Sequence, residues 1–248
     1  GQFGSRIPFI AAAIFTLFNL IYGYFILPES LKKNNRRKFD IKRANPVGTL
    51  SSLRRYPIIS GLLICIVLFN VAQHATHSTW TFFTIEKFNW GEDIVGYSLG
   101  FIGLLAAIVQ GGLIRIIIPK LGNINSVYFG MIFYIIGLTL ISFAGEGWMI
   151  FVFAIPLSLG GISGPALQGI MTNNIPDDEQ GEFQGGMTSL ISLTAIVGPL
   201  LMTNLFSFFT GENTLYYFPG APFILAAILS LFGLIIAIKF LSKTKIKY

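Results

Sequence analysis

The 248-residue chain is rich in apolar side chains and poor in charged ones, with 53% hydrophobic and 11% charged residues. An average soluble domain carries roughly 25% charged residues, which cover its water-facing surface. This deficit excludes an ordinary soluble domain and predicts an all-α membrane protein. The lone Cys65 excludes a disulfide within the chain. The formal net charge of +6 does not predict a nucleic-acid partner, because the basic residues flank apolar stretches.

Seven stretches are apolar enough to form transmembrane helices, each of which needs about 20 residues. In chain order they are residues 8–27, 57–83, 94–114, 127–144, 149–171, 187–206 and 222–240. We therefore expect seven transmembrane helices in a lipid bilayer. Because the chain begins at Gly1, without a Met or a signal-peptide pattern, we also expect a truncated start.

The stretch after the first span, residues 28–56, is polar and strongly basic. With seven spans, fifteen of the seventeen Lys and Arg residues fall on one side of the membrane and only Arg6 and Lys87 on the other. Basic residues in short loops face the cytoplasm. The sequence thus predicts that 28–56 is a cytoplasmic linker and that the C-terminus is also cytoplasmic. The linker either only holds topology beside anionic headgroups or also serves as a regulatory docking site.

The second span carries a polar stripe. Four of its side chains recur at helical spacing, namely Asn70, Gln73, His74 and His77. Polar groups are costly against hydrocarbon, so they face a bundle interior or an aqueous cavity. The stripe either lines a substrate cavity or only bonds neighbouring helices. Either His can take a proton near neutral pH, although a lone His is often only structural.

Later spans hold isolated polar side chains. Gln110 and Gln168 lie in apolar helices, where each either contacts the substrate or forms hydrogen bonds between helices. Arg115 and Lys120 end the third span, as a cytoplasmic gate or as positive-inside anchors. The spans carry two His, one Cys and no carboxylate, so neither a metal site nor another cofactor is expected. Trp80, Trp90 and Trp148, near outer helix ends, are typical of an aromatic belt.

An internal repeat indicates a duplicated protein. The first span opens Pro8-Phe9-Ile10-Ala11-Ala12-Ala13-Ile14, and the last opens Pro222-Phe223-Ile224-Leu225-Ala226-Ala227-Ile228. If these spans are equivalent, residues 1–27 are the last helix of an N-terminal bundle whose other members are missing. Residues 57–248 are then a six-helix C-terminal bundle, and the missing half is a partner. Paired repeats around a central path are typical of transporters.

Several short motifs, in their order and spacing, resemble the major facilitator superfamily, and within it the tetracycline-efflux-like drug:proton antiporters of bacteria. They are Leu27-Pro28-Glu29-Ser30, Phe88-Asn89-Trp90, Gly96-Tyr97-Ser98-Leu99, Pro165-Ala166-Leu167-Gln168, Glu179-Gln180-Gly181, Gln184-Gly185 and Gly198-Pro199-Leu200-Leu201. The resemblance covers essentially the whole chain, as the sixth to twelfth helices of the major facilitator fold. Two positions differ: Ala106 stands where well-studied exporters carry a His, and they have an intramembrane Asp near Tyr134.

The resemblance implies secondary active transport in the bacterial inner membrane, with efflux of a small amphipathic drug by alternating access and protons as the coupling ion. A nutrient symporter of the same superfamily is the alternative. A membrane-embedded enzyme needs clustered His or paired carboxylates, and the spans contain neither. We therefore expect a transporter and not an enzyme. A channel needs a filter or rings of charge, and the sequence shows no such pattern. No phosphate-binding loop for direct nucleotide drive occurs either.

Overall fold

The computed structural model describes residues 6–26, 57–212 and 214–242. The chain divides into two compact units, Gly1–Phe39 and Asp40–Tyr248, and each is described by itself. The linker predicted at 28–56 and the C-terminal Lys243, Lys245 and Lys247 lie outside the described residues. The first unit contains the helix α1, Ile7–Ile26, which has no charged residue and the length of one membrane crossing.

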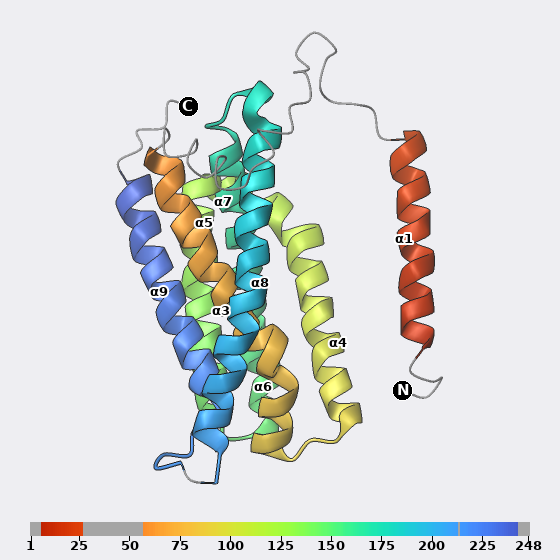
Figure 1. Ribbon diagram of the computed structural model, residues 1–248, viewed down its shortest axis with the longest axis vertical. Helices are drawn as coiled ribbons and strands as arrows, with labels where there is room; N and C mark the ends of the chain where they lie inside the picture. The colour runs from red at the N-terminus through yellow and green to blue at the C-terminus, as the bar shows by residue number, and fades with distance from the viewer. Residues whose placement is uncertain (1–5, 27–56, 213, 243–248) are drawn as a thin grey trace. The chain divides into compact units, whose positions relative to one another are not determined.

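The second unit is a helical bundle with α3, Pro57–Phe88, near its centre. α3 packs against α9, Ala221–Leu241, and against α8, Gln180–Thr210. α3 and α8 run in the same direction and α9 runs in the opposite one, so that α3 begins at the end of the bundle where α9 finishes (Figure 1). Close packing needs small residues: Gly61 of α3 lies beneath the ring of Phe240, where a Cβ would come within 2.5 Å of ring carbons.

The next part of the bundle is one long helical run that turns back on itself. It consists of α4, Glu92–Ile108, the π-helical turn η3, Val109–Leu113, and α5, Ile114–Phe143. The whole apolar run of 52 residues would measure about 78 Å as a straight helix, against roughly 30 Å of hydrocarbon. Gly122 interrupts it at φ 75° and ψ 161°, a backbone conformation that glycine adopts most readily. The run thus accommodates both spans predicted at 94–114 and 127–144.

Arg115 and Lys120 were expected to end the third span. Both lie just before the break at Gly122, in the helix that runs on from α4 and η3. The helix continues because the segment between them is apolar and because Pro119 is accommodated within it. Both cations are exposed.

The fifth predicted span is built from two pieces. α6, Gly147–Leu159, passes through the short 3-10 turn η4, Gly160–Ile162, into α7, Ser163–Thr172. Both pieces pack closely on α5. A Cβ on Gly137 would stand 2.5 Å from the backbone nitrogen of Leu157. After a second 3-10 turn, η5, Asp177–Glu179, the chain enters α8, which continues through Gly198 and Pro199.

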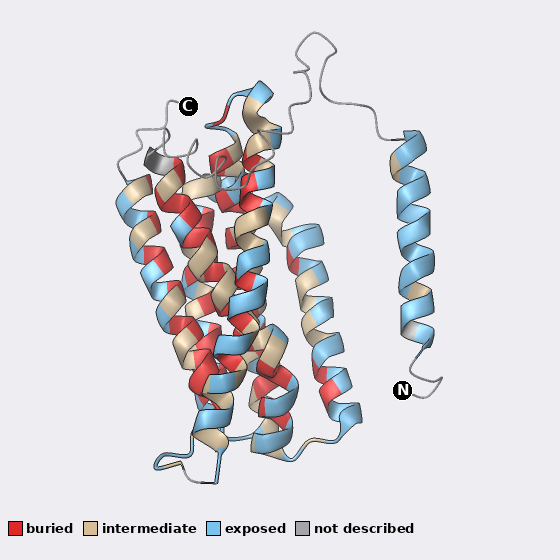
Figure 2. Cartoon of the chain, in the orientation of Figure 1, coloured by how far each residue is buried: buried red, intermediate tan, exposed pale blue. Residues whose placement is uncertain are grey.

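The core of the bundle is apolar, and much of its outer surface is apolar as well. Figure 2 shows how buried and exposed residues are distributed along the helices. Buried side chains follow the inner faces of α3, α5, α8 and α9. Large hydrophobic side chains also stand exposed along the helices, among them Phe82, Leu104, Ile196, Phe208 and Phe232. Such a surface suits a lipid solvent. Six helical stretches in the described residues are long and apolar enough to cross a membrane, and the chain is a multi-pass membrane protein.

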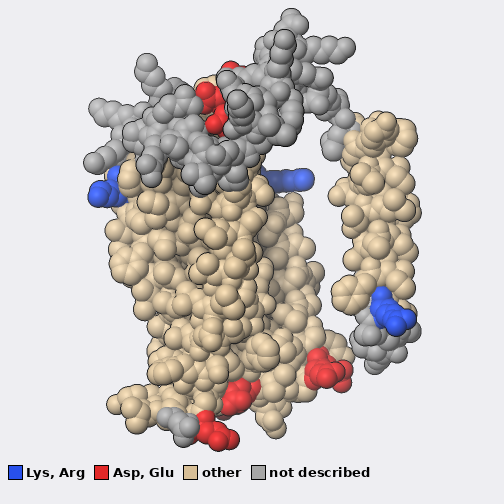
Figure 3. Space-filling view, viewed as in Figure 1, with Lys and Arg blue, Asp and Glu red and all other residues tan. Residues whose placement is uncertain are grey.

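Charged residues of the bundle gather at its ends (Figure 3). The end with the α4–α5 turn carries Arg115, Lys120 and Lys239, together with the acidic residues of η5. The opposite end is mostly acidic, with the residues Glu86, Glu92, Asp93, Glu146 and Glu212. Lys87 at this acidic end donates a hydrogen bond to the Ser142 carbonyl oxygen at 2.9 Å and lies over the Phe83 ring. Three of the four lysines and arginines that the structure describes in the bundle therefore lie at the end that the sequence predicts to be cytoplasmic.

The aromatic-belt prediction is wrong for Trp80. This side chain is buried, and its Nε1 donates a hydrogen bond to the Ser98 hydroxyl at 3.0 Å, which ties α3 to α4. Trp148, in contrast, is exposed, as an interfacial residue would be.

Candidate functional site: a polar cavity in the helical bundle

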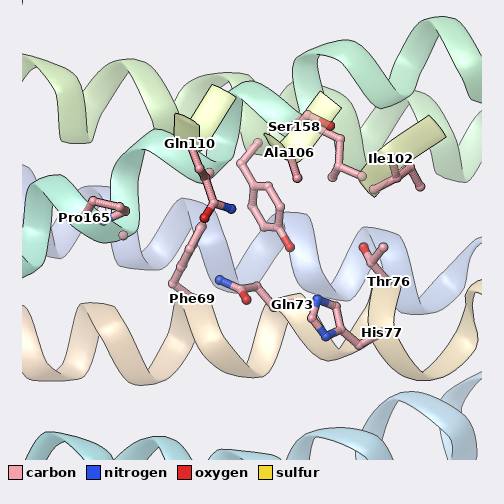
Figure 4. Close-up of a pocket in the computed structure, with 13 residues that line it drawn as sticks. Phe69, Gln73, Thr76, His77, Ile102, Ala106, Gln110, Ser158 and Pro165 are labelled. Carbon is pink, nitrogen blue, oxygen red and sulfur yellow. The ribbon is translucent and has the colours of Figure 1, made fainter. Parts of the chain in front are cut away.

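A cavity of about 270 Å³ lies among α3, the α4–η3 segment, α5 and the α6–η4–α7 segment. Its wall combines amide, imidazole and hydroxyl groups with aromatic and aliphatic side chains (Figure 4). The lining residues are Phe69, Gln73, Thr76, His77, Ile102, Ala106, Gln110, Tyr134, Leu157, Ser158, Gly161, Gly164 and Pro165. A second hollow is lined by Phe208 and Phe209 at the end of α8 and by residues 211, 212 and 214–216 of the loop between α8 and α9. Only the first brings polar side chains from several helices together.

The α3 side of the cavity comes from the polar stripe. Gln73, Thr76 and His77 fall at i, i+3 and i+4 of the helix, so they project from one face. In Figure 4 all three rise from α3 toward the opposite wall. Two residues of the stripe, Gln73 and His77, therefore line the cavity. Their side chains offer both hydrogen-bond donors and acceptors.

Gln110 approaches from the opposite wall. It lies in the π-helical turn η3, a kind of irregularity that is frequent at functional sites. Figure 4 shows its amide extended toward the Gln73 side of the cavity. Gly161 of η4 lies beside this side chain, and a Cβ on Gly161 would be in ordinary contact with the Gln110 Nε2 at 3.9 Å.

Among the lining residues that were not singled out as site residues from the sequence, Tyr134 and Ser158 contribute hydroxyl groups. The Tyr134 ring of α5 packs against the Phe69 ring, with centroids 4.9 Å apart and the planes tilted by 56°, and the two form an aromatic wall. The Ser158 hydroxyl of α6 also lines the cavity and has no hydrogen-bond partner among the described residues. Buried polar atoms are nearly always paired, so Ser158 offers an unused hydrogen-bonding group to a solute. In the sequence, the one feature that could have identified Tyr134 and Ser158 as cavity residues is their position within a transmembrane span.

Three of the predicted residues lie elsewhere. Asn70 uses its amide locally, donating to the Ile66 carbonyl oxygen at 2.9 Å. His74 turns toward α8, where its ring lies against Gly198 with no room for a Cβ. Gln168 of α7 donates to the Gln184 side chain of α8 at 3.4 Å. These residues connect helices or satisfy their own helix, and they do not line the cavity.

The described wall of the cavity contains no carboxylate and no lysine or arginine. Within the described residues, no group of three or more His, Cys, Asp or Glu side chains is placed to hold a metal ion. The site is thus suited to a solute that combines an apolar body with neutral hydrogen-bonding groups, which is the composition typical of small-molecule pockets.

Comparison with known proteins agrees with this architecture. The class C tetracycline resistance protein of Escherichia coli is 32% identical over 207 residues, which are 84% of this chain and 52% of that protein. The class E protein of Escherichia coli is 33% identical over 208 residues, covering 84% and 51%. A human relative, Hippocampus abundant transcript-like protein 1, is 23% identical over 258 residues, covering 96% and 50%. The chain therefore spans about half the length of these relatives.

A model of a protein family also matches most of the chain. Residues 1–185 match the model of the Major Facilitator Superfamily, a match that includes α1 and all the cavity-lining residues. Membership in a transporter family also agrees with the prediction of a transporter and not an enzyme. Together with the bundle of apolar helices, this match shows that the chain belongs to the Major Facilitator Superfamily.

Proposed function

We propose that this chain is part of a secondary active transporter that exports a small amphipathic, tetracycline-like drug in exchange for protons. The observation that carries the proposal is the cavity, where Gln73, His77 and Gln110 face an aromatic wall between apolar helices. Amide and imidazole groups hydrogen-bond the polar edge of such a drug, and Phe69 and Tyr134 pack against its rings. The similarity to tetracycline resistance proteins supports the same substrate class.

The size of the cavity supports a site shared between two halves. Drug-sized ligands occupy pockets of roughly 300–1,000 Å³, and the cavity in this unit measures about 270 Å³. We assign residues 1–27 to the last helix of an N-terminal bundle, 28–56 to a cytoplasmic linker and 57–248 to the C-terminal bundle. The missing N-terminal half supplies the remaining wall, and rocking of the two bundles gives alternating access.

Orientation follows from the charges. The basic end of the bundle, with Arg115 and Lys120, faces the cytoplasm of a bacterial inner membrane, and the linker and C-terminus lie on that side. Arg115 and Lys120 are exposed on α5, and this exposure supports a role for them as a gate that contacts the other half. Gln168 supports the cavity indirectly, through its bond to Gln184 at the α7–α8 contact, whereas Asn70 bonds within α3.

The test is drug accumulation in bacteria that express the complete gene. We expect cells with the transporter to hold several-fold less labelled tetracycline than control cells, and we expect a protonophore to abolish the difference. Unchanged accumulation of tetracycline and other amphipathic drugs, with proton-driven uptake of a nutrient, would instead establish the symporter alternative. ATP-dependent export that persists with a protonophore would exclude secondary transport.

A further inference from the structure

The loop between α8 and α9 carries large side chains with apolar surface on its outside. Leu215 is 93% exposed, Tyr216 is 77% exposed and Tyr217 is 58% exposed. Connections that face water are usually built from small and polar residues. Three consecutive side chains of this size are costly to leave in water, because each exposes apolar area that burial would stabilise. The loop therefore fits an interfacial environment better than an aqueous one.

Hydrogen bonds hold the loop in this arrangement. The backbone nitrogen of Phe218 donates to the Phe209 carbonyl oxygen at 3.0 Å and closes the loop on the end of α8. The Thr214 hydroxyl donates to the Tyr216 carbonyl oxygen at 3.1 Å. The Tyr217 hydroxyl donates to a carboxylate at the end of α3. The outward position of the apolar side chains is therefore a feature of a bonded backbone.

The apolar surface of the loop continues from an exposed face of α8. Leu201 and Phe208 lie about two turns apart on one side of this helix, and both are exposed, Phe208 by 71%. Figure 1 shows the loop at the end of the bundle where α8 finishes and α9 begins. This is the acidic end, where the apolar surface of the helices gives way to charged residues. Tyrosine is enriched where the hydrocarbon of a bilayer meets its headgroups, so the loop has the composition and the place of a membrane-surface segment.

The hollow beside this loop has a volume of about 500 Å³. Phe208, Phe209 and Leu215 give it apolar walls, and Glu212 and Thr214 add polar groups. Among the described residues of the wall, Glu212 is the charged one. A carboxylate beside an apolar wall is complementary to an amphipathic molecule whose polar end is a cation that can donate hydrogen bonds.

From these observations we propose that the hollow binds a phospholipid whose headgroup carries an ammonium group, as phosphatidylethanolamine does. The first part of the acyl chains packs on Phe208, Phe209 and Leu215, and the ammonium donates to the Glu212 carboxylate. An anionic headgroup without an ammonium, as in phosphatidylglycerol, is instead repelled by this carboxylate. A lipid held here anchors the loop at the membrane surface and, through the Tyr217 contact, also the end of α3.

The first test locates the loop in the complete transporter, reconstituted in bilayers that contain phosphatidylethanolamine. A nitroxide label on Leu215→Cys is expected to collide more often with oxygen, which concentrates in lipid, than with a water-soluble nickel complex. Asp93→Cys, an exposed position in the first turn of α4, is the aqueous control and should show the opposite order. Wild type gives the labelling background, since Cys65 is buried. A label at position 215 that behaves like the control, or that neither reagent reaches, would overturn the proposal.

The second test identifies the lipid. The complete transporter is released from nanodiscs with equal amounts of phosphatidylethanolamine and phosphatidylglycerol, and its bound lipids are weighed by native mass spectrometry. We expect Glu212→Gln to lower the ratio of retained phosphatidylethanolamine to phosphatidylglycerol several-fold relative to wild type, because the charge that attracts the ammonium is removed. Phe208→Ser should lower the total lipid retained, because an apolar wall of the hollow is lost.

Glu146→Gln is the matched control, since Glu146 is an exposed carboxylate at the same end of the bundle but does not line the hollow. This variant should keep the wild-type ratio, and size-exclusion chromatography verifies that every variant is folded. A lipid ratio that is the same in wild type and Glu212→Gln would overturn the ammonium-bearing lipid. Neither test uses a drug, so failure of the proposed export function would leave the lipid site standing, and the reverse also holds.

Discussion

At the scale of single residues, a contact between Glu86 and Tyr217 fastens the acidic end of α3 to the loop between α8 and α9. The Tyr217 hydroxyl donates a hydrogen bond to Glu86 Oε1 at 2.8 Å. Desolvation raises the pKa of Tyr217 to about 12, and the hydrogen bond to Glu86 and its negative charge act in the same direction. Because this pKa lies above the ordinary value near 10, folding favours the neutral phenol.

The pH dependence of this contact follows from the sign of the shift. Its contribution to stability is complete below about pH 10, the ordinary tyrosine value, and is lost as the pH rises through about 12. We expect the difference in absorbance at 295 nm between wild type and Tyr217→Phe to titrate near pH 12. In Glu86→Gln this midpoint should fall toward 10, because the carboxylate charge is removed.

Glu212→Gln is the control, since Glu212 is an exposed carboxylate beside the same loop and should leave the midpoint unchanged. A Tyr217 transition near pH 10 in the wild type would show that the contact does not form.

Only some of the residues that line the cavity could be predicted from the sequence, and the chemistry of their side chains explains which ones. Gln73, His77 and Gln110 were recognisable because amide and imidazole groups in apolar spans need a polar environment. Tyr134 and Ser158 were missed because hydroxyl groups in spans are commonly satisfied within their own helix, as Thr139 is by the Ile135 carbonyl oxygen. The direction of His74 depends on the position of α8, which helical periodicity does not encode.

At the scale of elements, the contact of α5 with α6 depends on the absence of a side chain at Gly137. A Cβ there would stand 2.5 Å from the Leu157 backbone nitrogen, and backbone cannot rotate away as a side chain does. We expect Gly137→Ala to destabilise the bundle by about 1–3 kcal/mol through overpacking. Thermal unfolding in detergent should show a midpoint several degrees lower.

Gly103→Ala is the matched change in α4, where a Cβ would meet no atom within 4 Å. This variant should unfold at the wild-type temperature or slightly above it, because alanine favours helix over glycine. Equal unfolding temperatures for the two variants would contradict the α5–α6 packing described here.

The positions of the helices could be predicted from the length of the apolar stretches, but the irregular turns within and between the helices could not. The stretch predicted at 222–240 corresponds closely to α9, Ala221–Leu241, because charge and turn residues bound it. In contrast, the turn at Gly122 and the π-helical turn η3 arise where the chain must reverse or present a side chain to a cavity. Such irregular backbone depends on tertiary packing and has no distinct residue pattern.

At the scale of the whole molecule, the charged ends of the bundle predict its orientation. Lys120 and Glu146 are exposed near opposite ends of α5, and the native Cys65 is buried. In spheroplasts, Glu146→Cys should react with a membrane-impermeant maleimide added outside. Lys120→Cys should react only after the membrane is permeabilised, because we propose that the end with Arg115, Lys120 and Lys239 faces the cytoplasm. The reverse pattern of labelling would invert the proposed topology.

The central proposal is that the cavity of this helical bundle is water-accessible and binds the drug, and alkylation at Gln110 tests it most directly. In membranes with the complete transporter, Gln110→Cys should react with a small hydrophilic thiol reagent, whereas wild type, with only buried Cys65 in this chain, serves as the background. Saturating tetracycline should slow the reaction at Cys-substituted Gln110 by tenfold or more, on the order expected when a ligand occupies its pocket. A thiol at this position that is unreactive, or that reacts at the same rate with and without the drug, would contradict the account.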